Sequence, residues 1–344
     1  MRIQKNRNEL LELAKYAFHK PVTGGDEAFF ALLEFAKAYQ HMEENQLTSM
    51  VIDIPFDVFW KNEKLKMSGI GYVASYPEFR GNGAIRNLMT KLLQDEYKKG
   101  TALSYLAPFS YTFYEKFGYA YSFDRKVYEL PAENFPSGRK TDGKIRRVTL
   151  AEGLEQLELI HSQAENEGSM SRAPHVWEYY FHYKSKPNFA IYEENGRPMG
   201  YLIYEFKGST FVIRELISLS KNAKDAIYRF IASHASGFDK MSWVTTPRER
   251  FEYDVQEPAA LTITQEPYMM ARIINLDEFI KVNGEPDFAV EIIDEQIPEN
   301  NRIFGSGQPV KMTIGAFTAE ILRKKWSNLT RVFLNFDYRM FNSL

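Results

Sequence analysis

The chain has 344 residues, of which 44% are hydrophobic and 26% charged, and this composition excludes a disordered or fibrous protein. Its formal net charge of -2 argues against nucleic acid as a partner, because phosphate binding requires a surplus of basic side chains. The sequence has no cysteine and its six histidines show no metal-ligand spacing, so we expect no disulfide, no thiol nucleophile and no metal site.

A chain of this length exceeds the roughly 100–200 residues of one domain, so we expect two or three domains. The N-terminus lacks the apolar run and cleavage site of a signal peptide, and no window approaches about 18 consecutive apolar residues. We therefore expect a cytoplasmic protein that has no membrane partner.

Residues 1–135 carry the signals of an α/β domain. A strand-like start at 1–6 precedes an apolar helical pattern, and residues 28–39 form a second helical run. Residues 46–59 and 64–76 are rich in β-branched and aromatic residues around a turn-like KNEK, which predicts a hairpin. Residues 84–100 place their apolar side chains on one face and end in Lys-Lys-Gly, which predicts a helix.

The rest of the chain divides into a linker and two further domains. Residues 131–144 combine Pro, Gly, Ser and charged residues, which is typical of a linker. Residues 144–265 repeat the order helix, β-hairpin, strand, helix, which indicates either an internal duplication or two common α/β units. From 266 to 344 the pattern changes again and predicts a small α+β domain.

The turn between the second hairpin strand and the following helix carries the most informative chemistry. Arg80, Gly81, Asn82 and Gly83 follow a strand that ends at Pro77, and the helix starts directly after them. Glycines let the backbone approach a phosphate closely, while a helix N-terminus supplies free N–H groups and a partial positive charge. The turn is therefore a candidate anion site, and an ordinary strand-to-helix connection is the alternative.

This strand, turn and helix resemble the acetyl-CoA pyrophosphate loop of GNAT acetyltransferases, whose motif is Arg/Gln-x-x-Gly-x-Gly/Ala. Arg80 and Gly83 match the motif, whereas Ile85 stands where a small residue is usual. The segments VASYPEFRGNGAI (73–85), LSYLAPFSYTFYEKFGYAYSF (103–123), PYMMARI (267–273) and TIGAF (313–317) resemble the enhanced intracellular survival (Eis) family. The resemblance implies an α/β (α+β) fold: a GNAT domain at 1–135, a degenerate GNAT-like domain at 144–265 and a sterol-carrier-protein-like domain at 266–344.

The resemblance also assigns roles to individual residues. It implies that acetyl-CoA is the cosubstrate, with pantetheine bound by backbone groups of Val73 and Ser75. The pyrophosphate would lie on Arg80, Gly81, Asn82, Gly83, Ala84 and Ile85. Tyr114 would be the general acid, and the C-terminal carboxylate, here that of Leu344, would be the general base.

The expected reaction is direct acetyl transfer, in a ternary complex, to amines of cationic small molecules such as aminoglycosides or polyamines. No acyl-enzyme is expected because the chain has no cysteine. Residues 219–226 of the second domain contain no glycine, so we expect no acetyl-CoA there, and Asp26, Glu27 or Glu34 could face the cationic substrate. A protein lysine acetyltransferase and a non-catalytic acyl-CoA- or lipid-binding protein are the alternatives. By resemblance alone, we expect a homo-oligomer, either a trimer or a hexamer.

Overall fold

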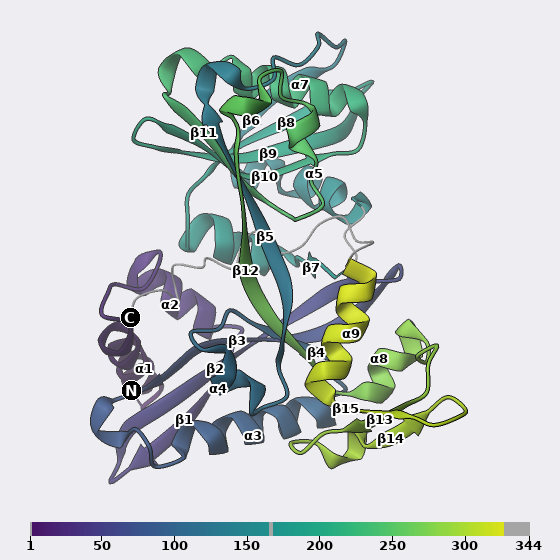
Figure 1. Ribbon diagram of the computed structural model, residues 1–344. Helices are drawn as coiled ribbons and strands as arrows, with labels where there is room; N and C mark the ends of the chain where they lie inside the picture. Colours follow the sequence, from purple (N-terminus) through teal and green to yellow (C-terminus); the bar gives the residue numbers. More distant parts are fainter. Residues whose placement is uncertain (1, 165–167, 327–344) are drawn as a thin grey trace. The chain divides into compact units, whose positions relative to one another are not determined.

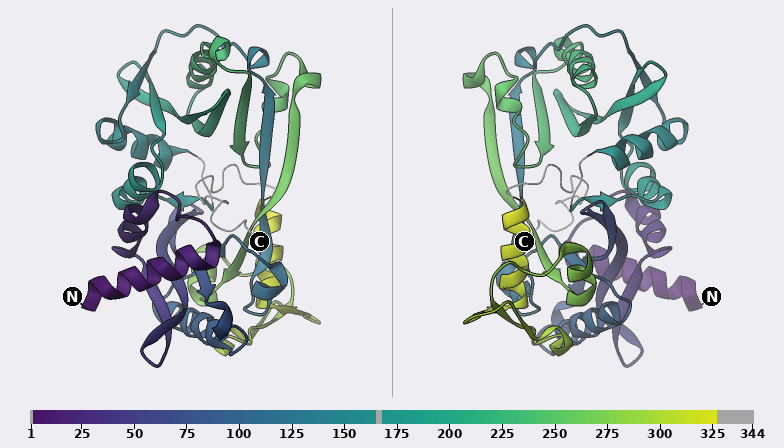
Figure 2. Two further views of the ribbon diagram at one scale, coloured as in Figure 1. Left: turned by 90° about the vertical axis from the view of Figure 1, so that its left-hand side faces the viewer. Right: turned by 90° about the vertical axis from the view of Figure 1, so that its right-hand side faces the viewer.

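The computed structural model describes residues 2–164 and 168–326, and these fold into two compact units. Unit 1 contains residues 2–123 and 268–326, and unit 2 contains residues 124–164 and 168–267. The chain thus leaves unit 1, builds unit 2 and returns to unit 1 (Figures 1 and 2).

Unit 1 is built on a mixed sheet in the order β1-β2-β3-β4-β12, in which only the β3–β4 pair is parallel. Its strands are β1 (Lys37–Glu43), β2 (Gln46–Trp60), β3 (Glu63–Ser75), β4 (Leu103–Leu106) and the end of β12 (Thr262–Ile273). Its helices are α1 (Arg2–Phe18), α2 (Gly25–Leu33), α3 (Ala84–Lys98), α4 (Tyr111–Glu115), α8 (Leu276–Asn283) and α9 (Ile314–Trp326). A second, small sheet contains β13 (Val290–Ile293), β14 (Arg302–Phe304) and β15 (Val310–Thr313).

The predicted hairpin and helix of unit 1 are confirmed. β2 and β3 pair antiparallel, and Lys61 and Asn62 connect them with φ angles of 47° and 64°, as tight hairpin turns require. Helix α3 buries its apolar face in the core of the unit, against strand residues such as Val51 and Ile70. The turn predicted as an anion site therefore lies between two well-packed elements.

Two local predictions at the start of the chain are wrong. The strand-like start at 1–6 is helical from Arg2, because Arg, Gln and Lys are good helix formers that extend the helix packed through Leu10. The second helical run ends at Leu33, and residues 37–43 form β1 instead. There Tyr39 pairs with Val51 of β2, so the gain from strand pairing and burial outweighs local helix propensity.

Unit 2 repeats the arrangement with a sheet in the order β5-β11-β10-β9-β8-β6. Its strands are the end of β5 (Ala120–Pro131), β6 (Lys144–Val148), β7 (Met170–Ser171), β8 (Asn188–Glu194), β9 (Arg197–Lys207), β10 (Thr210–Ser218) and β11 (Lys240–Thr245). Its helices are α5 (Leu150–Gln163), α6 (Pro174–Glu178), the π-helical η3 (Tyr179–Tyr183) and α7 (Lys221–Ala232). β10 and β11 are parallel, as β3 and β4 are in unit 1, so the predicted repeat of elements is confirmed.

The predicted linker at 131–144 is part of unit 2 rather than a connection between units. Phe135 is buried, and its ring lies 5.3 Å from the rings of both Tyr228 and Phe251. The chain changes unit after Phe123, within β5. One buried aromatic side chain is sufficient to anchor a segment whose composition is otherwise typical of a linker.

The third predicted segment lies in the same compact unit as the first. Arg272 at the end of β12 donates to the carboxylate of Asp294, and Asn300 Nδ2 donates to the same carboxylate over 2.9 Å. These three side chains are at most 2% exposed. The polar cluster anchors residues 294–300 within unit 1, and a separate domain at 266–344 stays a prediction.

Candidate active site

β3 extends beyond its parallel partner, and this creates an open strand edge. The β3–β4 register runs from Met67 opposite Leu103 to Ile70 opposite Leu106, whereas β3 continues to Ser75. Backbone N–H and C=O groups past the last pair, around Val73 and Ser75, can bind an extended ligand as an added strand would. The structure thus places both predicted pantetheine-binding residues beyond the point where the two strands stop pairing.

A bulge in β3 accompanies this separation. The β2–β3 register shifts between Met50 and Ile52, where β3 has one extra residue, and Tyr72 adopts a φ of 49°. Such a left-handed residue costs about 1–2 kcal/mol. Its side chain is buried, with ring centroids 5.9 Å from Phe18 and 5.0 Å from Phe29, so contacts with α1 and α2 stabilise the bulge. Sequence reasoning missed this bulge.

The predicted anion turn has the geometry of a phosphate-binding loop. Gly81 and Gly83 have φ angles of 84° and 85°, and α3 begins at Ala84. Arg80 to Gly83 are exposed, whereas Ala84 is buried and Ile85 packs against the core. Exposed N–H groups at the start of a helix of 15 residues, next to a guanidinium, attract an anion.

Asn82 organises this turn. Its Oδ1 accepts a hydrogen bond from the N–H of Ala84 over 2.9 Å, and its Nδ2 donates to Glu43 Oε1 over 2.9 Å. The asparagine therefore caps the first N–H of α3 and ties the turn to the end of β1. An anion that binds the same N–H has to displace the Asn82 carbonyl.

Tyr114 lies on α4, whose N-cap is Ser110. Its side chain is 1% exposed, and burial raises the pKa of the Tyr114 phenol well above its usual value. Among the described residues, no hydrogen bond links this hydroxyl to a partner. Val73 and Ile85 pack against the hydrophobic cluster that contains Tyr114, so the predicted acid and both parts of the predicted cofactor site border one core.

A buried polar chain behind Tyr114 was not found from the sequence. The Tyr119 hydroxyl contacts Ser104 Oγ over 2.7 Å, and Ser104 Oγ donates to the carbonyl of Ser68 over 2.8 Å. Ser68 Oγ in turn donates to Asp53 Oδ1 over 2.6 Å. Burial, together with the neighbouring Glu96, raises the pKa of Asp53 to about 7. An aspartate inside the apolar run VIDIPF was the available signal.

The structure gives little support to the other predicted site residues, which are the C-terminal residue and three acidic residues near the N-terminus. Leu344 lies outside the described residues. Lys15 Nζ lies 3.0 Å from Asp26, and Arg7 Nη1 lies 2.6 Å from Glu34, so both carboxylates already have a cationic partner. Glu27 is exposed.

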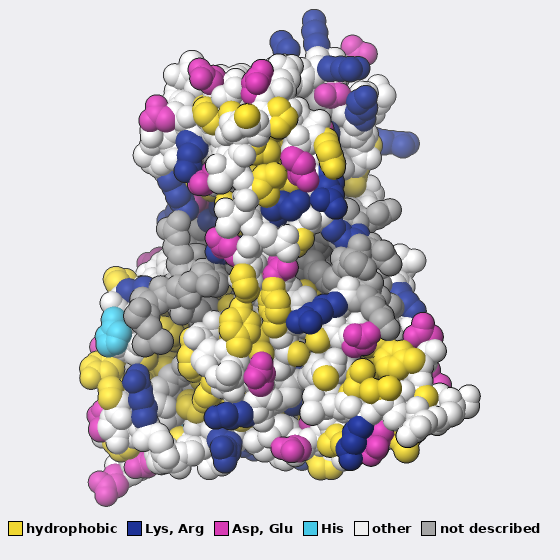
Figure 3. All heavy atoms as spheres, viewed as in Figure 1, with side chains coloured by type: hydrophobic (Ala, Val, Ile, Leu, Met, Phe, Trp, Pro, Cys, Tyr) yellow, Lys and Arg dark blue, Asp and Glu magenta, His cyan; other side chains and the backbone are white. Residues whose placement is uncertain are grey.

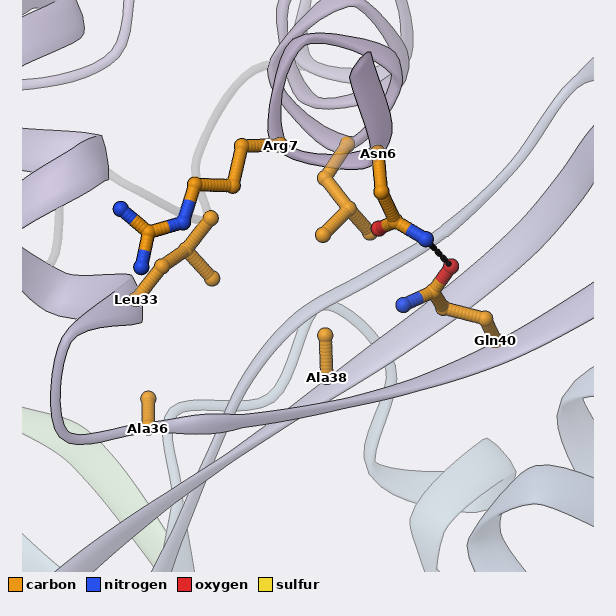
Figure 4. Close-up of a pocket in the computed structure, with 7 residues that line it drawn as sticks. Asn6, Arg7, Leu33, Ala36, Ala38 and Gln40 are labelled. Carbon is orange, nitrogen blue, oxygen red and sulfur yellow. Dashed lines mark hydrogen bonds between the residues drawn. The ribbon is translucent and has the colours of Figure 1, made fainter. Parts of the chain in front are cut away.

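One hollow in unit 1, with a volume of about 390 Å³, lies between α1, the end of α2 and β1 (Figure 4). Asn6 Nδ2 donates to Gln40 Oε1 over 3.1 Å at one side, and Arg7 lies at the other. Neither the residues of the anion turn nor Tyr114 line it.

The corresponding turn of unit 2 is built differently. Ser220 is the N-cap of α7, and its Oγ accepts from the N–H of Ala223 over 3.1 Å. A bidentate ion pair between Arg172 and Glu215, with distances of 2.9 and 2.6 Å, lies buried in this unit. The start of α7 is thus capped by a serine side chain, and the absence of acetyl-CoA binding in this unit stays a prediction.

The surface carries both signs of charge. On the face shown in Figure 3, Lys and Arg side chains are interspersed with Asp and Glu. Among the described residues, no helix combines the length and apolar composition that a membrane span requires.

Comparison with known proteins agrees with this geometry. Residues 4–122 match an acetyltransferase (GNAT) domain, and residues 168–273 match a second acetyltransferase (GNAT) domain. No curated protein gave a match. The two matches define an acyltransferase with two tandem domains of mixed α/β fold.

Solved structures extend the similarity over more than nine tenths of the chain. A protein from Enterococcus faecalis V583, described as a conserved protein of unknown function and probable N-acyltransferase, is 32% identical, with a TM-score of 0.86, over 93% of this chain and 88% of that one. A GCN5-related N-acetyltransferase from Anabaena variabilis is 19% identical, with a TM-score of 0.81, over 97% of this chain and 98% of that one. Eis1 from Mycobacterium abscessus is 16% identical, with a TM-score of 0.74, over 94% of this chain and 90% of that one.

The chain therefore belongs to the GNAT acyltransferase family. GNAT domains in general use acetyl-CoA as the acyl donor, and the residues around the anion turn fit its pyrophosphate.

Proposed function

We propose that this enzyme transfers the acetyl group of acetyl-CoA to primary amines of cationic small molecules of the aminoglycoside or polyamine type. One observation carries the acetyl-CoA part of the proposal: Val73 of the open strand edge and Ile85 of the anion turn pack on the cluster that holds the buried Tyr114. The three features are those that a thioester, its pyrophosphate and its leaving group require. The substrate class comes from the Eis resemblance.

Acetyl-CoA supplies an activated acetyl group as a thioester. Arg80 and the N–H groups from Gly81 to Ile85 hold the pyrophosphate, and the backbone of Val73 and Ser75 orients the pantetheine. In the transfer, an N–C bond forms at the amine while the C–S bond breaks, and the phenol of Tyr114 gives its proton to the departing sulfur.

The Tyr114 phenol is protonated at neutral pH, as a donor must be, although burial raises its pKa and so makes it a weaker acid than a phenol in water. A thiolate released in the same dry cluster is also poorly solvated and therefore more basic than in water. The carboxylate of Leu344 would accept the proton that the substrate ammonium loses before attack and release it to water. The second proton, which the nitrogen loses as the amide forms, would return to the Tyr114 phenolate, so that protons balance over the cycle.

Further parts of the proposal come from the Eis resemblance. They are membership of an Eis-like branch, a sterol-carrier-like third domain, a trimeric or hexameric assembly and a cytoplasmic location. The similarity to Eis1 from Mycobacterium abscessus, with a TM-score of 0.74, supports the same fold.

The test is CoA release from acetyl-CoA with a panel of aminoglycosides and polyamines. We expect turnover that falls about 10²-fold or more in Tyr114→Phe and in a chain shortened at Leu344. Tyr97→Phe removes a hydroxyl from the edge of the same cluster and should keep full activity. Tight acetyl-CoA binding without turnover on any amine would refute the small-amine assignment, and acetylation of protein lysines alone would support the alternative substrate.

A further inference from the structure

Gln296 connects helix α3, which follows the anion turn, to the turn that follows Tyr114. It lies after β13, and its Oε1 accepts a hydrogen bond from Thr90 Oγ1 over 2.8 Å. Its Nε2 donates to the carbonyl of Lys116 over 3.2 Å. Thr90 lies in the second turn of α3, and Lys116 caps the C-terminus of α4. One side chain thus spans the two elements that carry the anion turn and the proposed acid, and we call it the Gln296 bridge.

The Gln296 bridge is itself held in place by buried charge. Asp294 Oδ1 accepts from the backbone N–H of Gln296 over 3.0 Å, and Asp294 also binds the Arg272 guanidinium. Arg272 Nη1 donates to the carbonyl of Phe117, the residue next to Lys116. Arg272 is 0% exposed and Asp294 is 2% exposed. Two consecutive carbonyls of the same turn therefore accept hydrogen bonds from one rigid polar cluster.

The turn is packed on one side and borders a cavity on the other. Gly118 has a φ of 75°, and a Cβ there would lie 2.8 Å from Ile314 Cγ2, so the turn passes close to α9. Next to it lies a cavity of about 450 Å³, lined by residues 115, 116, 118–120, 293–296 and 313–316. A loop that borders a cavity has fewer van der Waals contacts on that side, so its position depends on its hydrogen bonds.

We propose that Gln296 is a positioning residue for acetyl transfer. It fixes the distance between the start of α3, where the pyrophosphate binds, and α4, where Tyr114 donates its proton. This inference rests on the proposed role of Tyr114 as general acid. An acid must lie within hydrogen-bond reach of the departing sulfur, and an error of about 1 Å can cost up to 10²-fold in rate.

A purely structural role predicts a different result. Gln296 is partly buried, and loss of two hydrogen bonds at such a site lowers stability only slightly. If the role of Gln296 were purely structural, loss of these hydrogen bonds would leave kcat unchanged in the folded enzyme. A positioning role instead lowers kcat while acetyl-CoA binding is kept, and it acts only when the acid is present.

The experiment combines Gln296→Met with Tyr114→Phe in the full chain. Methionine keeps the length of the side chain and removes both hydrogen bonds. We expect kcat to fall about tenfold, with an unchanged KM for acetyl-CoA and a small change in Tm. In the Tyr114→Phe background, we expect Gln296→Met to have no further effect on kcat. Gln40→Met removes a glutamine that bonds Asn6 in the same unit and should keep the kcat of the native enzyme.

The outcomes separate the inference from the proposed function. An equal loss of kcat from Gln296→Met in both backgrounds, or no loss in either, overturns the positioning role and leaves Tyr114 as the acid. An unchanged kcat in Tyr114→Phe refutes the acid and the positioning role together. Gln296→Glu still accepts from Thr90 but faces the Lys116 carbonyl with a carboxylate, so a loss of kcat there assigns the effect to the contact with Lys116.

Discussion

The buried carboxyl pair of Asp53 and Glu96 should make the stability of unit 1 depend on pH. Burial and the neighbouring Glu96 raise the pKa of Asp53 from 3.8 to about 7. Glu96 is also buried, which acts against ionisation, but hydrogen bonds from Lys99 and Thr101 lower its pKa. At pH 5 to 6, Asp53 therefore holds the proton and Glu96 carries the charge, whereas near pH 7 Asp53 is about half ionised.

The direction of this pH dependence follows from the number of protons that the folded and unfolded states bind. The folded protein keeps a proton on Asp53 that the unfolded chain loses, so stability falls as pH rises through the interval between 3.8 and about 7. Over this whole interval, the native protein loses at most about 4 kcal/mol of its free energy of unfolding. Glu96 changes stability in the opposite direction, because the stabilisation that its ionised form provides is lost as pH falls below 4.5. Between about pH 5 and pH 8, Asp53 thus dominates the pair.

Asp53→Asn is the decisive change. Its amide oxygen still accepts from Ser68 Oγ, and its NH₂ group can donate to Glu96 as the protonated acid does. We expect the stability advantage of the variant over the native protein to grow by about 3 kcal/mol between pH 5 and pH 8.5, because about two pH units separate pH 5 from the Asp53 pKa of about 7. Urea unfolding followed by tryptophan fluorescence at both pH values measures the difference.

Asp57→Asn is the control, because Asp57 lies on the same strand with its side chain exposed. It makes the same change in charge and should not alter the dependence of stability on pH. If Asp53→Asn and the native protein lose stability in parallel between pH 5 and pH 8.5, Asp53 is ionised in the folded protein and the reasoning is refuted.

Two further perturbations test the anion turn and unit 2. Gly83→Ala places a Cβ at a φ of 85°, which costs about 1–2 kcal/mol of strain, and should raise the KM for acetyl-CoA, whereas Gly208→Ala imposes a similar strain in unit 2 and should leave that KM unchanged. Arg172→Met leaves the Glu215 carboxylate buried without its ion pair and should cost about 3–5 kcal/mol in urea unfolding. A loss from Arg172→Met no larger than the roughly 0–1 kcal/mol expected for the more exposed pair of Arg302 would contradict the buried-pair argument.

Much of the fold, and the backbone geometry of the candidate anion turn, could be predicted from the sequence because the signals are local. The alternating and β-branched residues of 46–59 and 64–76 specify the hairpin, and the apolar spacing of 84–100 specifies α3. Gly81 and Gly83 are needed at positive φ, and this requirement is visible in one short stretch.

The features that were missed depend on contacts between distant residues. Nothing near Tyr72 in the sequence shows that Phe18 and Phe29 will support its positive φ. The interaction of Arg272 with Phe117 likewise joins residues 155 positions apart. Residues 37–43 became a strand only because β2 offers a partner. The roles of Tyr114 and Leu344 were assigned by resemblance, and both stay predictions.

Unit 1 is built from two separate stretches of the chain, so its parts are synthesised at different times. Residues 2–123 leave the ribosome first, but their sheet is completed by 270–273 of β12, which pairs with β4. The described part of unit 2 lies wholly between these stretches, so it is translated in full while unit 1 still lacks a strand and the Arg272 cluster. A nascent chain released early would therefore contain the anion turn and Tyr114 without the residues that hold them in place.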